Sequence, residues 1–127
     1  MFSHVMIGTN NLEKAKAFYD ALLGTLGVPP GMVDRHRVFW RTKTGTFAVT
    51  LPINGQAATF ANGGTLGFAC ESPEQVDAWH AAGCAHGGTS CEEPPGVREG
   101  AAGRLHLAYL RDLDGNKICA LYRYPRA

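Results

Sequence analysis

The sequence has few charged residues, no excess of either sign of charge and no long apolar run. Only 18% of its 127 residues are charged, against about 25% in an ordinary soluble domain, so a disordered acidic or basic chain is excluded. Its 12 Lys and Arg residues nearly balance its 11 Asp and Glu residues, so the basic footprint of a nucleic-acid binder is missing. From this charge balance we expect no nucleic-acid partner. No apolar stretch approaches the roughly 20 residues that cross a bilayer, so we expect no membrane partner either.

The N-terminal residues lack the features of an export signal. The opening residues, MFSH, contain no basic segment that leads into an apolar stretch. The four cysteines include no C-x-x-C pair. In a chain with its own core and no export signal, we expect them to be free thiols. These features predict a soluble cytoplasmic protein.

What is present is the composition of a folded, sheet-rich domain. Hydrophobic residues make up 45% of the chain, and its length lies within the range of about 100–200 residues for one domain. The 16 glycines and 7 prolines imply many turns, which suit a sheet-rich protein better than a helical bundle. We therefore expect residues 1–127 to form a single domain.

The first half of the chain predicts a strand, a helix and a hairpin. β-branched residues alternate with others over residues 2–8, which is typical of a strand. Asn10 or Asn11 then caps a helix whose apolar stripe runs from Leu12 to Leu26. The rest of this half is predicted as two hairpin strands and a linker, at residues 37–41, 46–51 and 52–64.

The second half repeats this order. Residues 65–70 predict a strand. A helix follows, with Ser72 as its cap, Pro73 as its first residue and Gln75 as the capping-box partner. The remaining predicted elements are a stiff loop, a strand, a turn and a last strand, at residues 92–100, 104–111, 112–116 and 117–123.

The two halves can be aligned by counting residues. The pairs that matter are His4 with Thr65, at an offset of 61, and Val49 with Cys119, at the offset of 70 between the turn glycines Gly45 and Gly115. A solenoid would need at least three shorter repeats. We therefore predict an α+β fold of two βαβββ modules, about residues 1–60 and 61–127.

Three segments carry a family resemblance: HVMI at residues 4–7, AFY at residues 17–19 and DLDGNKI at residues 112–118. At these places in a doubled βαβββ chain, they are similar to the glyoxalase/bleomycin-resistance/dioxygenase, or vicinal-oxygen-chelate, superfamily, over essentially the whole chain. The resemblance implies that each module curls its sheet into a half-barrel. It also implies that the halves often come from two subunits, so we expect a homodimer. Family membership fixes the fold better than the reaction.

The resemblance also implies a cup that usually holds one divalent metal, with ligands at four positions. The family's first histidine matches His4, and its repeat partner falls on Thr65. The two positions that often hold glutamate fall on Val49 and Cys119. Valine has no donor atom, a threonine hydroxyl is a poor ligand, and zinc sites normally have at least three protein ligands. We therefore expect no Zn, Ni, Mn or Fe, and we assign these four residues to the ligand-binding cup.

Five residues have a functional and a structural interpretation. His4 is the best proton-transfer group near neutral pH, or a hydrogen-bonded rim histidine. Cys119 could act with His4 as a thiolate nucleophile, although a buried structural cysteine is commoner. Arg98 either pairs with an anionic substrate or is a solvated loop residue. His106 lines the pocket or an exposed strand face, and Trp40 forms an aromatic wall or packs in the core.

The leading functional expectation is a protein of this superfamily whose cup binds a small organic molecule without the usual metal, with or without acid–base chemistry by His4. One alternative is a metal-dependent lyase or dioxygenase of the same superfamily, with ligands at other positions. The other is a structural or interaction module with a packed cup. An apolar pocket of roughly a few hundred Å³ favours ligand binding, whereas a cup filled by Val49 and its neighbours favours the structural module.

Overall fold

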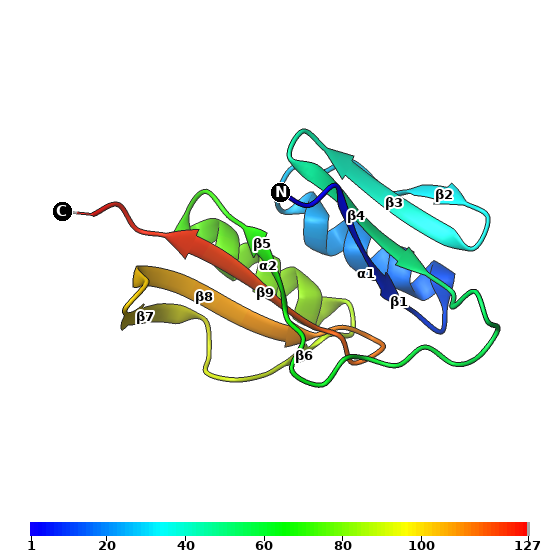
Figure 1. Cartoon of the computed structure of the whole chain (residues 1–127). Coiled ribbons are helices and arrows are strands. Elements are labelled where there is room, and N and C mark those ends of the chain that lie inside the picture. Colours follow the sequence, from blue (N-terminus) through cyan, green and yellow to red (C-terminus); the bar gives the residue numbers. More distant parts are fainter. Residues whose placement is uncertain (127) are drawn as a thin grey trace.

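The first module is a four-stranded sheet with one helix behind it, as the computed structural model, which describes residues 1–126, shows (Figure 1). Its elements are β1 (His4–Gly8), α1 (Leu12–Gly24), β2 (Met32–Asp34), β3 (Arg37–Thr42) and β4 (Gly45–Thr50). The strands lie in the order β1-β4-β3-β2. β1 runs parallel to β4, because α1 carries the chain back across the sheet between them, and the other pairs are antiparallel hairpins.

The second module repeats this arrangement with a broken outer strand. Its elements are β5 (Leu66–Ala69), α2 (Pro73–Ala85), β6 (Thr89–Ser90), β7 (Gly96–Gly100), β8 (Gly103–Arg111) and β9 (Lys117–Arg123). The order is β5-β9-β8-β6, and β7 pairs with β8 further along the same edge. The α+β fold of two βαβββ modules is therefore confirmed. Residue 127, the end of the predicted second module, lies outside the described residues.

Three short strands, β2, β6 and β7, were not predicted. β7 lies inside residues 92–100, which the sequence predicted as a loop. Its sequence, GVREG, is largely exposed and lacks the apolar alternation of a half-buried strand. It becomes a strand because the chain turns back at once and pairs it with β8. The predicted linker is confirmed, since no strand interrupts the described chain between β4 and β5.

Each helix begins where a side chain accepts a hydrogen bond from the first turn. Asn11 accepts from the backbone N–H of Lys14 at 3.0 Å, and Ser72 accepts from the N–H three residues on at 3.1 Å. Asn10, the alternative cap, instead binds the linker, since its Oδ1 and Nδ2 pair with the N–H and carbonyl of Ala58 at 2.7 and 3.3 Å. Asn10 thus ties the linker to the end of β1.

The two modules share one apolar core, which contains a row of aromatic rings. The ring centroids of Tyr19 and Phe47 are 4.7 Å apart, and those of Phe47 and Phe68 are 5.3 Å apart. The row ends at Trp79 of α2, whose ring lies 6.2 Å from that of Phe68. Such pairs contribute about 0.5–1.5 kcal/mol each beyond the area that they bury. Because Phe47 and Phe68 belong to different modules, this core joins the two sheets.

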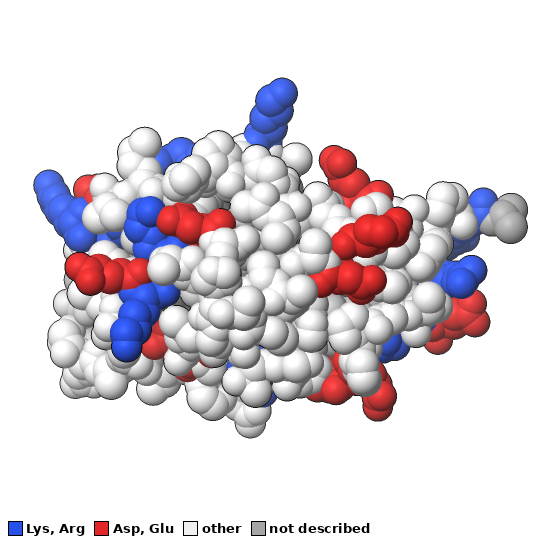
Figure 2. All heavy atoms as spheres, turned by 180° about the vertical axis from the view of Figure 1, so that it is seen from behind, with Lys and Arg blue, Asp and Glu red and all other residues white. Residues whose placement is uncertain are grey.

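The outer sides of the helices carry charged residues. α1 exposes Glu13 and Lys14, and α2 exposes Glu74 and Asp77. Figure 2 views the molecule from this side and shows acidic and basic side chains, next to one another at its left end, on a largely uncharged surface. Within residues 1–126, neither helix is long and apolar enough to cross a membrane.

Candidate functional site

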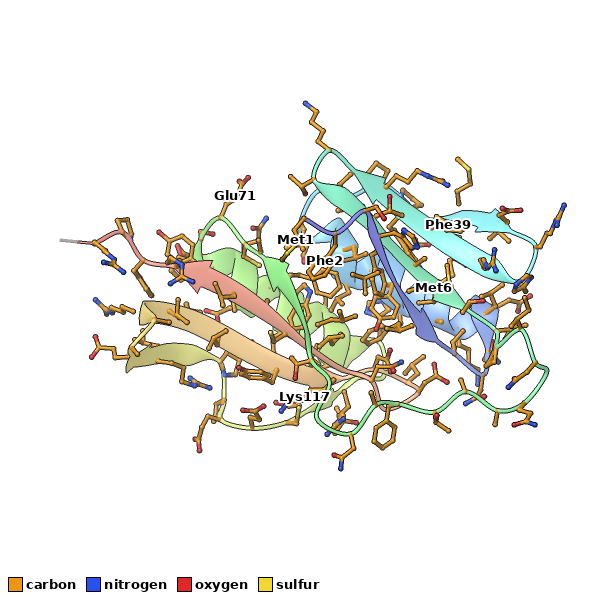
Figure 3. All side chains as sticks on the ribbon, viewed as in Figure 1. Met1, Phe2, Met6, Phe39, Glu71 and Lys117 are labelled. Atoms are coloured by element: carbon orange, nitrogen blue, oxygen red, sulfur yellow. The ribbon has the colours of Figure 1, made fainter. Side chains whose placement is uncertain are left out.

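Each sheet has a helix face, which packs on the helices, and an open face on its other side. Side chains alternate between the two faces along a strand, and paired residues on neighbouring strands share a face. Val49 lies in the core, so Val49 and its β1 partner Ile7 belong to the helix face. His4 and its β4 partner Thr46 therefore belong to the open face, together with Met6, which is labelled in Figure 3.

The predicted pairing of Val49 with Cys119 is out of register by one residue. Val49 is on a helix face, whereas Cys119 pairs with Gly67 and Tyr109 on the open face of the second sheet. The open-face equivalent of Cys119 is Ala48, at an offset of 71 rather than 70. The turns cause the difference, because two residues separate β3 from β4 and five separate β8 from β9. Val49 therefore lies on the opposite face of its sheet from His4.

His106 and Trp40 also lie on the helix faces. His106 Nε2 is 2.9 Å from Oδ1 of Asp77 on α2, so this histidine joins the helix to the sheet. That placement corrects the expectation that His106 lines a pocket. Trp40 is 1% exposed, and its Nε1 donates to Oδ1 of Asp20 at 2.9 Å. Trp40 packs in the core, as its structural interpretation predicted, and it is also one of the residues that line the cavity described below.

Thr65 and Arg98 lie apart from His4. Thr65 is exposed at the residue before β5. Arg98 donates from Nη2 to the carbonyl oxygens of Glu93 and Pro94 at 3.1 and 2.9 Å. Its guanidinium therefore holds the loop between β6 and β7.

Cys119 is a buried thiol on the open face of the second sheet. Burial raises the pKa of Cys119 to about 11, and the nearby Glu92 acts in the same direction. A thiol with that pKa is protonated at neutral pH. This chemistry does not fit a thiolate nucleophile and fits the structural interpretation of Cys119.

A cavity of about 440 Å³ lies between the two modules. Leu23, Trp40 and Phe47, all buried, line it from the first module, and Phe68 lines it from the second. Phe2 also lines the cavity, and Figure 3 shows Phe2 in the space between the two sheets. The cavity thus exists because the modules pack through their helices and aromatic core and leave β1 and β5 unpaired with each other.

Two polar residues of the open face, His4 and Thr46, are neighbours on β1 and β4, and both line the cavity. Neighbouring strands are about 4.8 Å apart, so both groups can reach one ligand atom or two adjacent ones. The Nδ1 atom of His4 is 2.8 Å from Oγ of Ser3. Among the hydrogen bonds within residues 1–126, His4 takes part through Nδ1 of its ring, which leaves Nε2 available to a ligand, and the partly exposed Thr46 hydroxyl is available too.

Of the predicted site residues, the cavity brings together His4 and Trp40 only. Those outside its lining are Val49, Thr65, Arg98, His106 and Cys119. Cys119 lies directly behind the lining, since a Cβ at Gly67 would be 3.3 Å from its Sγ. Thr46 could not be identified from the sequence, because its position beside His4 follows from the parallel pairing of β1 with β4.

A second cavity, of about 450 Å³, lies at the other end of β1. It is lined mainly by residues 51–57 of the linker, together with Thr9, Asn10 and His36. No residue of the second module lines it, and the row of core aromatics does not reach it. The cavity between the modules is therefore the better candidate for a site that depends on the whole fold.

The donor atoms of the described residues do not fit a divalent metal. Among residues 1–126, no group of three or more His, Cys, Asp or Glu side chains is placed to hold an ion. His4 and Cys119, the two donors of the predicted set, lie on different sheets. A thiol that holds its proton is also a poor ligand, because the thiolate is the form that binds metal.

Comparison with known proteins gives a family match and a similar structure of high identity. Residues 1–120 match the family model described as the glyoxalase/bleomycin resistance protein/dioxygenase superfamily. A glyoxalase/bleomycin resistance protein from Albidiferax ferrireducens T118 has 68% sequence identity and a TM-score of 0.95, covering 97% of this chain and 99% of that one. No curated protein matches the sequence.

More distant structures share the fold. A putative glyoxalase from Bacillus halodurans has 23% identity and a TM-score of 0.74, with 96% of this chain and 95% of that one covered. A lactoylglutathione lyase from Agrobacterium tumefaciens has 18% identity and a TM-score of 0.67, with 96% and 92% covered. At these identities the likeness extends to the arrangement of the strands and helices alone.

Proposed function

The chain belongs to the glyoxalase/bleomycin resistance protein/dioxygenase superfamily, and from that premise we propose that it binds a small organic molecule in the cavity between its modules. The observation that carries the proposal is the cavity itself. Its volume of about 440 Å³ lies within the range of roughly 300–1,000 Å³ for small-molecule sites. Such sites are mostly apolar with a few placed polar groups, which describes a lining of aromatic and aliphatic side chains with His4 and Thr46.

The two alternative functions have less support. A metal-dependent lyase or dioxygenase needs a set of metal ligands, and no such set exists among residues 1–126. A structural module with a packed cup needs the space between the modules to be filled. Val49 packs in the core on the helix face of its own sheet and does not line the cavity between the modules.

The binding proposal is tested with small aromatic probes of two fused rings. Saturation-transfer NMR and titration by calorimetry are run with naphthalene-2-carboxamide, naphthalene-2-carboxylate and naphthalen-2-ylmethylammonium. We expect at least one probe to bind at one site per chain. If none of the three binds the folded protein, the proposed function is wrong.

Two matched variants locate the probe. Val5→Phe adds bulk inside the cavity lining, whereas Val97→Phe adds the same bulk at an exposed position of β7 outside the lining. We expect the first to weaken binding about tenfold and the second to leave it unchanged, since the probe and the new ring compete for one space. Ala69→Phe, at an exposed lining residue, serves if Val5→Phe unfolds. Equal binding by all variants would place the probe elsewhere.

We also propose that the protein forms a homodimer. β1 and β5 each pair with one strand only among the described residues, and free sheet edges are normally protected. Phe2, Met32 and Val33 are exposed apolar side chains that an interface of at least about 1,200 Å² would cover. Sedimentation equilibrium at micromolar concentration should give twice the mass of one chain. A clean monomer overturns the dimer and leaves the cavity proposal standing.

A further inference from the structure

The cavity lining contains no ionic side chain. None of its residues is Asp, Glu, Lys or Arg, and His4 is its only titratable group. Resting on the binding function proposed above, we propose that the ligand is an uncharged aromatic compound of two or three rings with one amide or phenol group that meets His4 and Thr46.

The absence of countercharges selects against ionic ligands. A charged group loses its hydration when it enters an apolar site, and the loss is large unless an opposite charge or several hydrogen bonds replace the water. Leu23, Phe47 and Phe68 line the site and supply neither. A neutral ring system loses little hydration there and gains contact with the aromatic walls.

Charged groups that stand beside the lining in the sequence, among them the N-terminal ammonium of Met1, do not themselves line the cavity. Lys43 lies in the β3–β4 turn between two lining threonines but does not itself line the cavity. The guanidinium of Arg41 lies over the ring of Phe39, with Cζ 4.8 Å from the ring centroid. Glu71, beyond the end of β5, points away from the space between the sheets in Figure 3. None of these three charged side chains lines the cavity.

The polar pair specifies the kind of hydrogen-bonding group. If Ser3 donates to Nδ1 of His4, then Nε2 carries a proton and donates to the ligand; in the other tautomer Nε2 accepts. The Thr46 hydroxyl both donates and accepts. An amide or a phenol offers a donor and an acceptor within the spacing of adjacent strands, so either group satisfies both side chains in both tautomers. A ligand group that has acceptors but no donor satisfies the two side chains in just one of the two tautomers.

The volume sets the size of the ring system. An apolar cavity of about 150 Å³ holds one benzene molecule. The cavity between the modules, at about 440 Å³, is roughly three times as large. Two or three fused or linked rings with one polar group therefore fill it.

The three naphthalene probes separate this inference from the proposed function, because they share one ring system and differ in charge. Calorimetry at pH 8, where imidazole side chains are mostly neutral, should give an affinity for the carboxamide about tenfold or more above that of the carboxylate and the ammonium ion. A carboxylate or ammonium that binds as tightly as the carboxamide overturns the inference and leaves the binding function intact. Failure of all three overturns the function.

A matched pair of variants tests the polar contact. Thr46→Val removes the hydroxyl beside His4 at nearly constant shape, and we expect it to weaken binding of the carboxamide about fivefold. Thr50→Val makes the same change on the same face of β4 outside the lining and should leave binding unchanged. Lys43→Gln should change the affinity of no probe. Unchanged affinity in Thr46→Val, or an altered carboxylate affinity in Lys43→Gln, contradicts the inference.

Discussion

The hairpin turns of the two modules occupy equivalent places in the repeat but differ in length and in contacts. The β3–β4 turn has two residues, Lys43 and Thr44, and Thr44 lies at the cavity together with Thr42 at the end of β3. The β8–β9 turn has five residues and reaches across to the first module. The equivalent turns therefore differ in their role: the β3–β4 turn lies at the rim of the candidate site, and the β8–β9 turn connects the two modules.

The connection is a network around Asp112, which is 7% exposed. Its carboxylate accepts the hydroxyl of Tyr19 on α1 at 2.5 Å and Nδ2 of Asn116 at 2.9 Å. Asn116 Nδ2 also donates to the carbonyl of Gly8 at 3.1 Å. Burial, with Asp112 as the next cause, raises the pKa of Tyr19 well above its usual value, so this phenol remains a donor. The DLDGN motif thus has a structural function in this chain.

The largest expected effect comes from breaking this network. Asp112→Ala leaves the buried Tyr19 hydroxyl and the backbone N–H of Asn116 without an acceptor, and it removes one of the two acceptors of Asn116 Nδ2. Each unsatisfied buried group costs about 1–3 kcal/mol. We expect the free energy of unfolding in urea to fall by at least about 3 kcal/mol. Thr44→Ala, in the turn of the first module, should change it by less than about 0.5 kcal/mol. Similar losses in both variants would show that the two turns are equivalent after all.

The second prediction compares the C-terminal parts of the two helices. A Cβ at Gly83 of α2 would lie 2.2 Å from Cδ1 of Leu110 and 3.0 Å from Cδ1 of Leu22, whereas a Cβ at Gly24 of α1 would meet nothing within 4 Å. We expect Gly83→Ala to destabilise the protein by about 2 kcal/mol through overpacking. Gly24→Ala should stabilise it by about 0.5 kcal/mol through helix propensity. Thermal unfolding measures both, and a stabilising Gly83→Ala would refute the close packing at that position.

The smallest effect concerns the equivalent open-face residues Ala48 and Cys119. Because burial raises the pKa of Cys119 from 9.0 to about 11, the folded state holds this proton more tightly than the unfolded chain does. The resulting stability is complete below pH 9 and is lost as the pH rises from 9 to 11. Cys119→Ala replaces the thiol by alanine, which is the residue at the equivalent position Ala48. We expect it to reduce the loss of unfolding free energy at pH 10 by about 1 kcal/mol.

The control for this pH effect is Cys84→Ala, at an exposed thiol. Urea unfolding at pH 8, 9 and 10 gives the free energy of unfolding at each pH, and we expect it to fall with pH as steeply in this variant as in the parent. Burial also raises the pKa of Cys70 to about 11, so Cys119→Ala should keep part of this fall of stability with pH. If the free energy of unfolding falls with pH as steeply in Cys119→Ala as in the parent, the Cys119 thiol is not buried as described.

The main elements could be predicted because their signals are local. Ser72 and Pro73 mark the start of α2 in the sequence, and the last strand predicted after the turn, residues 117–123, has the observed bounds of β9. The strand β7 could not be predicted, because its exposed residues form a strand only through pairing with β8. The misalignment of Val49 with Cys119 came from treating the turn glycines as equivalent, which holds only for turns of equal length.

The candidate site was less predictable than the fold. His4 was identified from its place on an alternating strand. Thr46 lies beside it because β1 and β4, which are far apart in the sequence, pair in parallel. Phe47 and Phe68 meet at the cavity because the modules pack against each other. Neither contact has a signal in the local sequence, and the same is true of the contact that turns His106 toward Asp77.

The reach of the β8–β9 turn has a consequence for synthesis on the ribosome. The backbone N–H of Asn10 donates to Asp114 at 2.8 Å across a separation of 104 residues, and the hydroxyl of Tyr19 needs Asp112. Ribosomes add about 5–20 residues per second, and N-terminal regions usually fold first. Here the N-terminal module cannot complete its hydrogen bonds until nearly the whole chain has left the exit tunnel. The two modules are therefore expected to reach their final structure together, after translation, although each alone has the connectivity of an independent unit.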